Sequence, residues 1–134
     1  MIGILIISHE KLGDSLIACA THMLGETPQQ LSALAVKGDV EPEALLQQAK
    51  QMAIELDSGE GVLILSDIFG GTPCNIATKL VSMRQSHGIS GLNLPMLIEA
   101  LSNRHLSLED CLNKTMNNGQ ESILHFNEKG CVPL

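Results

Sequence analysis

The chain has 134 residues, of which 44% are hydrophobic and 1% aromatic, and it carries a formal net charge of -7. A chain of this length can bury one full core, so we expect a single domain over residues 1–134, with a polar tail at about residues 127–134. The acidic balance and the lack of Trp and Tyr argue against a nucleic-acid partner, because neither a basic stripe nor base-stacking side chains are present.

No apolar run approaches the roughly 20 residues of a membrane-spanning helix, so we expect a cytoplasmic protein. The cysteines lie far apart, and neither they nor the histidines have the spacing of zinc ligands. We therefore expect reduced thiols, no metal site and no cofactor. The four cysteines are Cys19, Cys74, Cys111 and Cys131.

The first half of the chain alternates short apolar runs with stretches of helical spacing. An apolar run at residues 2–7 predicts a buried strand, and an aspartate then introduces a helix over residues 14–24. A second strand is predicted at 31–36. The segment that follows has a proline near its start and predicts a helix over about residues 39–56.

The alternation continues in the second half. Strands are predicted at residues 62–65 and 89–94, with a helix over 72–83 between them. Thr72 is the predicted N-cap of that helix, and Pro73 is its predicted first helical residue.

The last part of the chain predicts two helices and a strand. Pro95 opens a short helix over residues 96–101. Ser107 begins a capping box for a helix that ends near Gly119. The segment 121–126, "ESILHF", is predicted as a final strand.

Alternating strands and helices predict an α/β fold made of βαβ units with right-handed crossovers. We expect three layers, α/β/α, around a mostly parallel, doubly wound sheet. Its expected strand order is 2-1-3-4, the usual order in small folds of this type.

Two strand ends carry the candidate chemistry. The first predicted strand leads to His9, and the third leads to Asp67. With the order 2-1-3-4 these strands are neighbours, so both side chains emerge at the carboxyl edge of the sheet, where ligands collect. A carboxylate beside an imidazole fixes its tautomer and stabilises its cationic form, which leaves the other ring nitrogen free as a nucleophile or base.

A phosphate-sized anion site is predicted directly after Asp67. Gly70 and Gly71 allow backbone angles closed to other residues, and Thr72 begins a helix whose first amides lack partners. Together these groups can hold phosphate oxygens. Each feature has a structural alternative: a loop histidine, an aspartate cap and an ordinary tight turn. The coincidence of the histidine, the aspartate and the glycine-lined helix start at one sheet edge favours phosphoryl transfer through a phosphohistidine.

The sequence closely resembles the IIA component of the mannose (fructose/mannose/sorbose) family of the bacterial phosphoenolpyruvate-dependent sugar phosphotransferase system (PTS). Three motifs carry the resemblance, which spans nearly the whole chain. They are "IGILIISHEKLGDSL", "GVLILSDIFGGTPCNIA" and "GLNLPMLIEAL".

This resemblance implies a phosphocarrier and therefore a phosphotransferase component. His9 would accept phosphate from phospho-HPr and pass it to a histidine of a IIB component on a separate chain, which serves a IIC/IID membrane permease. Asp67 would be its acidic partner, and Thr72 with the adjoining backbone would help bind the phosphoryl group. The resemblance also implies a homodimer with an antiparallel edge strand exchanged between subunits, which we assign to residues 121–126.

Three other functions stay open from the sequence. The chain could be a regulatory phospho-acceptor without a permease of its own. It could be the phosphocarrier subunit of a dihydroxyacetone kinase, although that relative lacks the Gly-Gly-Thr-Pro arrangement. A small-molecule hydrolase with His9 as general base is the third. The sugar is not predicted.

The remaining candidate residues receive structural interpretations. Glu10 and Lys11 are expected to be solvated loop charges, with docking to a partner as an alternative. Phe69 is interpreted either as part of an apolar docking surface or as a core side chain. Four histidines are assigned no catalytic role: His22, His87, His105 and His125.

Overall fold

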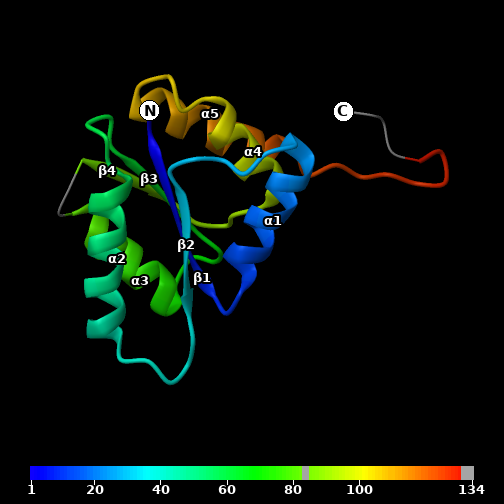
Figure 1. Ribbon diagram of the computed structural model, residues 1–134. Coiled ribbons are helices and arrows are strands. Elements are labelled where there is room, and N and C mark those ends of the chain that lie inside the picture. Colours follow the sequence, from blue (N-terminus) through cyan, green and yellow to red (C-terminus); the bar gives the residue numbers. More distant parts are fainter. Residues whose placement is uncertain (83–84, 131–134) are drawn as a thin grey trace.

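The structure is a computed structural model that describes residues 1–82 and 85–130. Four strands and five helices alternate through this part of the chain, as Figure 1 shows. The strands are β1 (Gly3–His9), β2 (Leu31–Val36), β3 (Val62–Ser66) and β4 (Ser86–Ile89). The helices are α1 (Leu12–Leu24), α2 (Pro42–Leu56), α3 (Gly71–Val81), α4 (Leu94–Ser102) and α5 (Leu108–Glu121).

The four strands form one sheet in the order β2-β1-β3-β4, and every pair is parallel. The predicted fold class and strand order are therefore confirmed. Both edges of β1 are paired, because it lies between β2 and β3. Both of its faces are covered by helices, and Ile2 to Ile7 include no polar side chain. This explains why the first apolar run does not alternate with polar residues.

Helices cover both faces of the sheet and make the three layers (Figure 1). On one face, Leu5 and Ile7 of β1 pack with buried residues of α2 and α3. On the other face, Ile4 and Ile6 pack with residues of α1, α4 and α5. Alternate side chains of one strand therefore supply two separate cores, as the two-residue period of a strand requires.

Three predicted element boundaries are wrong. The fourth strand lies at Ser86–Ile89 rather than 89–94, because the later apolar residues belong to a loop and to the start of α4, and Asn93 caps that helix through the Met96 N–H. Helix α1 begins at Leu12 rather than after Asp14. Helix α3 begins at Gly71, so Thr72 is its second residue and not its N-cap.

The other helix starts agree better with the sequence. Pro42 is the first residue of α2, and the Ser107 side chain caps α5 by accepting the Asp110 N–H at 3.1 Å. Met83, at the predicted end of the third helix, lies outside the described residues.

The segment 121–126 is not a strand within this chain. Glu121 ends α5, and residues 123–126 have no regular structure. The segment extends away from the domain (Figure 1), and Ile123 and Leu124 are 80% and 78% exposed. The segment contains residues that favour strands, but these do not form a strand where no neighbouring strand is available for pairing. An antiparallel strand exchanged between subunits stays a prediction.

Candidate functional site

A tight turn at the end of β1 positions His9. The buried hydroxyl oxygen of Ser8 accepts the Gly13 N–H at 2.9 Å, which ties the start of α1 to the end of the strand. Gly13 is required for this close approach, because a Cβ there would lie 2.8 Å from Cγ2 of Ile6. Between them, Glu10 adopts a φ of 49°, a backbone angle uncommon for residues other than glycine.

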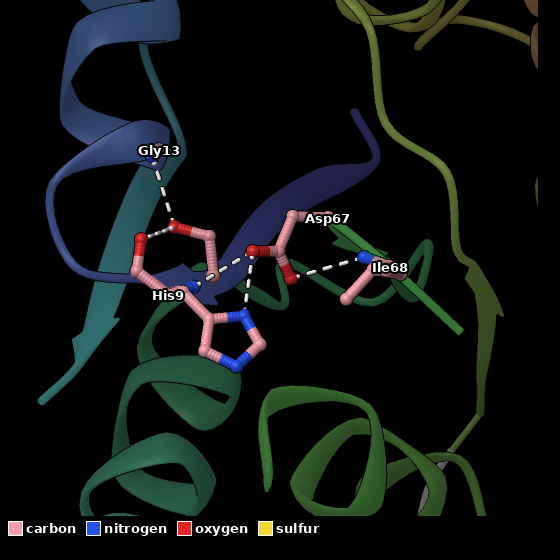
Figure 2. A network of polar contacts seen from close by, with 5 residues as sticks. His9, Gly13, Asp67 and Ile68 are labelled. Carbon is pink, nitrogen blue, oxygen red and sulfur yellow. Dashed lines mark hydrogen bonds and ion pairs between the residues drawn. The ribbon is translucent and has the colours of Figure 1, made fainter. Parts of the chain in front are cut away.

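Asp67 holds His9 through two hydrogen bonds. Its Oδ2 accepts the backbone N–H of His9 at 2.9 Å and lies 2.9 Å from the ring nitrogen Nδ1 (Figure 2). Its Oδ1 accepts the N–H of Ile68 at 3.0 Å. The carboxylate therefore fixes both the backbone and the ring of His9, and this geometry favours the tautomer with the proton on Nδ1.

Parallel pairing of β1 with β3 makes this contact possible. Ile7 is opposite Ser66 in the register, so the chain leaves the two strands side by side at His9 and Asp67. The His9 side chain is 53% exposed, whereas that of Asp67 is 9% exposed. The imidazole is therefore open to a partner while the acid beneath it is shielded.

The pKa of the Asp67 carboxyl lies below its ordinary value of 3.8. Burial alone raises the pKa, but hydrogen bonds from the backbone and ring N–H groups of His9, the charge of that ring and a backbone hydrogen bond at Asp67 together outweigh that effect. Asp67 is consequently a carboxylate at neutral pH, which makes it able to stabilise positive charge that develops on the neighbouring ring.

The start of α3 lies against the other side of the ring. A Cβ on Gly71 would lie 3.6 Å from Cε1 of His9 and 3.7 Å from Nε2. Gly70 and Gly71 have φ angles of 90° and 79°, which glycine adopts without strain. The first amide groups of α3, including that of Thr72, lack intrahelical partners and present the positive end of the helix dipole.

A groove of about 370 Å³ opens beside His9. Figure 2 shows that Nε2 is on the edge of the ring away from Asp67. A reacting group that reaches Nε2 therefore meets an exposed nitrogen with the start of α3 beside it. The groove is lined by His9, Glu10, Val36, Lys37, Gly38, Val40, Pro42 and Thr72.

The other candidate residues lie at several places in the fold. Phe69 is 85% exposed, so its interpretation as a core side chain is wrong. The four remaining histidines are exposed, in α1, in β4, between α4 and α5, and after α5: His22, His87, His105 and His125.

The cysteines and helices hold no further candidate site. Cys19, Cys74 and Cys111 are free thiols, and Cys131 lies outside the described residues. Within residues 1–82 and 85–130, no group of three metal-ligating side chains is close enough to hold a metal ion. None of the helices in the same ranges combines the length and the apolar character needed to cross a membrane.

Sequence reasoning missed the supports around the site. The bond from Gly13 to Ser8 and the strained Glu10 were not anticipated, and neither was the place of Lys37 in the groove. The signal for the first of these was a hydroxyl residue directly before His9 with a glycine four residues after it. Nothing in the local sequence around Lys37 indicates that β2 ends next to His9.

Comparisons with known proteins identify the family of the chain. Residues 3–116 match the family model EIIA-man, described as "PTS system fructose IIA component". The chain is 33% identical over 125 residues to the fructose-specific EIIA component of the PTS from Bacillus subtilis, covering 92% of this chain and 85% of that protein. It is 30% identical over 125 residues to the mannose-specific EIIAB component from Escherichia coli, covering 91% of this chain and 38% of that protein.

A solved structure has a similar fold. The crystal structure of phosphotransferase system component EIIA from Streptococcus agalactiae superposes with a TM-score of 0.84 at 25% identity. The match covers 93% of this chain and 97% of the other. The similarity therefore extends over most of this chain.

Proposed function

This chain belongs to the EIIA-man family of PTS IIA components, and from that premise we propose that it is a phosphocarrier whose phosphoryl group is carried on Nε2 of His9. Membership gives it a role in the sugar phosphotransferase system. The donor is phospho-HPr, and the acceptor is a histidine of a IIB component on a separate chain that serves a IIC/IID permease. The exchange takes place between proteins in the cytoplasm.

One observation carries this proposal: Nδ1 of His9 lies 2.9 Å from Oδ2 of Asp67, while the ring itself is half exposed. In the transfer, the lone pair of Nε2 attacks phosphorus as the nitrogen–phosphorus bond of the donor breaks and its electrons return to the donor ring. The proton on Nδ1 stays in place. Since the ring becomes positive as the new bond forms, the carboxylate of Asp67 stabilises the product and the transition state that leads to it.

The start of α3 supports the transferring group. Phosphoryl transfer has a loose transition state with charge spread over three equatorial oxygens, so it requires positioning and hydrogen-bond donors more than covalent chemistry. We assign these donors to the backbone N–H groups of Gly70 and Gly71 and to the backbone and hydroxyl of Thr72. The closeness of Gly71 to the ring supports this assignment, because a Cβ at that position would lie 3.7 Å from Nε2 of His9.

The proposal is tested by incubating the protein with phosphoenolpyruvate, enzyme I and HPr, then measuring intact mass and acid lability. We expect one acid-labile phosphoryl group per chain and none in His9→Ala. His105→Ala is the matched control, because it removes an exposed histidine outside the groove and should be labelled like the wild type. Labelling of His9→Ala would refute the assignment of the phosphorylated residue.

A homodimer is the second part of the proposal. Three apolar side chains after α5 are exposed: Ile123 at 80%, Leu124 at 78% and Phe126 at 67%. Large exposed apolar groups at the end of a chain are stabilised when a second subunit covers them. We expect a dimer of the 14.3 kDa chain by light scattering, and a monomer when Leu124→Asp and Phe126→Asp are combined. A monomeric wild type at micromolar concentration would contradict the strand exchange.

A further inference from the structure

Lys37 leaves the sheet beside the residue that reacts. His9 is opposite Val36 in the pairing of β1 with β2, and the N–H of Glu10 donates to the Val36 carbonyl oxygen at 3.1 Å. Lys37 directly follows Val36, so its backbone lies next to the turn that carries His9. Lys37 lines the same groove as His9 and Thr72.

The charges around this groove are unbalanced for a phosphoryl group. The lining includes the carboxylate of Glu10 and one permanent cation, that of Lys37. Asp67 adds a second carboxylate in contact with the ring. In residues 1–82 and 85–130 the His9–Asp67 contact is the one ion pair within 4.0 Å, so the Lys37 ammonium has no carboxylate partner in this part of the chain.

We propose that the Lys37 ammonium binds the phosphoryl group carried on Nε2 of His9. This inference rests on the phosphocarrier function proposed above and adds a residue to its site. A phosphoryl group with up to two negative charges would share the groove with Glu10, and the start of α3 offers only about half a positive charge. Because the carboxylate of Asp67 faces the ring, the ammonium of Lys37 is the full positive charge in the groove lining that can offset the charge of Glu10 and of the phosphoryl oxygens.

Lys37 contacts the group without forming a bond to it. When the acceptor histidine attacks, the bond between Nε2 and phosphorus breaks and its electrons return to the His9 ring, while the ammonium remains against the equatorial oxygens. Thr72 at the start of α3 and Lys37 directly after β2 both line the groove. The phosphoryl group is thereby held between two elements that follow different strands.

The test uses a phosphoryl donor that needs no protein partner. Wild type, Lys37→Gln and Lys37→Arg are phosphorylated with phosphoramidate, a small inorganic donor, and the second pKa of the phosphoryl group is followed by phosphorus NMR against pH. Lys114→Gln is the matched control, because it changes the net charge by the same amount as Lys37→Gln. Lys114 is exposed on α5, which packs on the opposite face of the sheet from α2 and α3.

A cation about 5 Å from the phosphoryl group lowers its pKa by about 0.5 unit in a solvent-exposed site. We therefore expect Lys37→Gln to raise that pKa by about this amount, with Lys37→Arg and Lys114→Gln close to the wild type. Equal pKa values in Lys37→Gln and Lys114→Gln would overturn the inference. If only the KM for phospho-HPr changes, Lys37 binds the partner protein instead, and the inference is wrong.

The experiment also separates this inference from the proposed function. A Lys37 effect on phosphoramidate-labelled His9, without labelling by phospho-HPr, would support the binding role and refute the HPr-dependent carrier. Labelling by phospho-HPr without a Lys37 effect would support the HPr-dependent carrier and refute the binding role of Lys37. If His9 accepts a phosphoryl group from neither donor, both are refuted.

Discussion

Replacing Asp67 with asparagine tests the central contact of the site. Oδ2 of Asp67 accepts two N–H groups of His9 and Oδ1 accepts that of Ile68, so all three donors face a carboxylate. An asparagine has one acceptor oxygen, and its amide group must therefore oppose either His9 or Ile68. A hydrogen bond to a charged group contributes about 1.5–3 kcal/mol, so we expect phosphoryl transfer to slow by about 10- to 100-fold.

The assay is rapid-quench transfer from phospho-HPr, with circular dichroism and urea unfolding to check the fold. We expect a loss of about 0.5–1.5 kcal/mol in the free energy of unfolding, since one N–H group of His9 or Ile68 loses its acceptor. Asp57→Asn is the matched control, because Oδ1 of Asp57 accepts the N–H groups of Gly59 and Gly61 before the opposite end of β3. A transfer rate within twofold of the wild type in a folded Asp67→Asn protein would refute the reasoning.

Three further predictions concern stability and the turn residues. Because the folded pKa of Asp67 is below 3.8, its contribution to stability is present above that pH and is lost as the pH falls through the lower folded value. In urea unfolding, the stability difference between wild type and Asp67→Asn should therefore shrink below pH 3.8, and a constant difference would contradict this. Gly13→Ala should lower the free energy of unfolding by about 1–3 kcal/mol, since the new Cβ meets Ile6. In Gly38→Ala, the control, the new Cβ meets nothing within 4 Å, so the loss should be smaller. Equal losses in the two variants would refute the packing argument. Gly71→Ala, at a φ of 79°, should cost about 1–2 kcal/mol and slow labelling of His9, and an unchanged labelling rate would argue against α3 as a phosphoryl-binding element.

The exposed ring of His9 suits a carrier that reacts with proteins rather than with small molecules. A histidine on a partner must approach Nε2 in line, and this requires an open rim instead of a closed pocket. Ile68 and Phe69 are 57% and 85% exposed in the loop that follows Asp67. These apolar side chains are suited to cover the site and exclude water when a partner docks.

Local sequence predicted some elements better than others. The second strand and the start of α2 were located well, because branched apolar runs and a proline at the first helical position are strong local signals. The start of α3 was placed one residue late because glycine is a weak helix former, yet α3 begins at Gly71, which lies beside the ring of His9. The fourth strand was placed too late because Leu92, which lies beyond the end of β4, packs in the core without pairing in the sheet.

The sequence by itself determined the α/β class, the strand ends that carry His9 and Asp67, and a glycine-rich start for α3. These follow from periodicity and residue type, which act over a few neighbouring residues. Only the tertiary structure decided that Oδ2 of Asp67 holds both the backbone and the ring of His9, and that Lys37 lines the same groove as His9. Such contacts join residues 28 to 58 positions apart, and their distances depend on how parallel strands align in register, which no local pattern encodes.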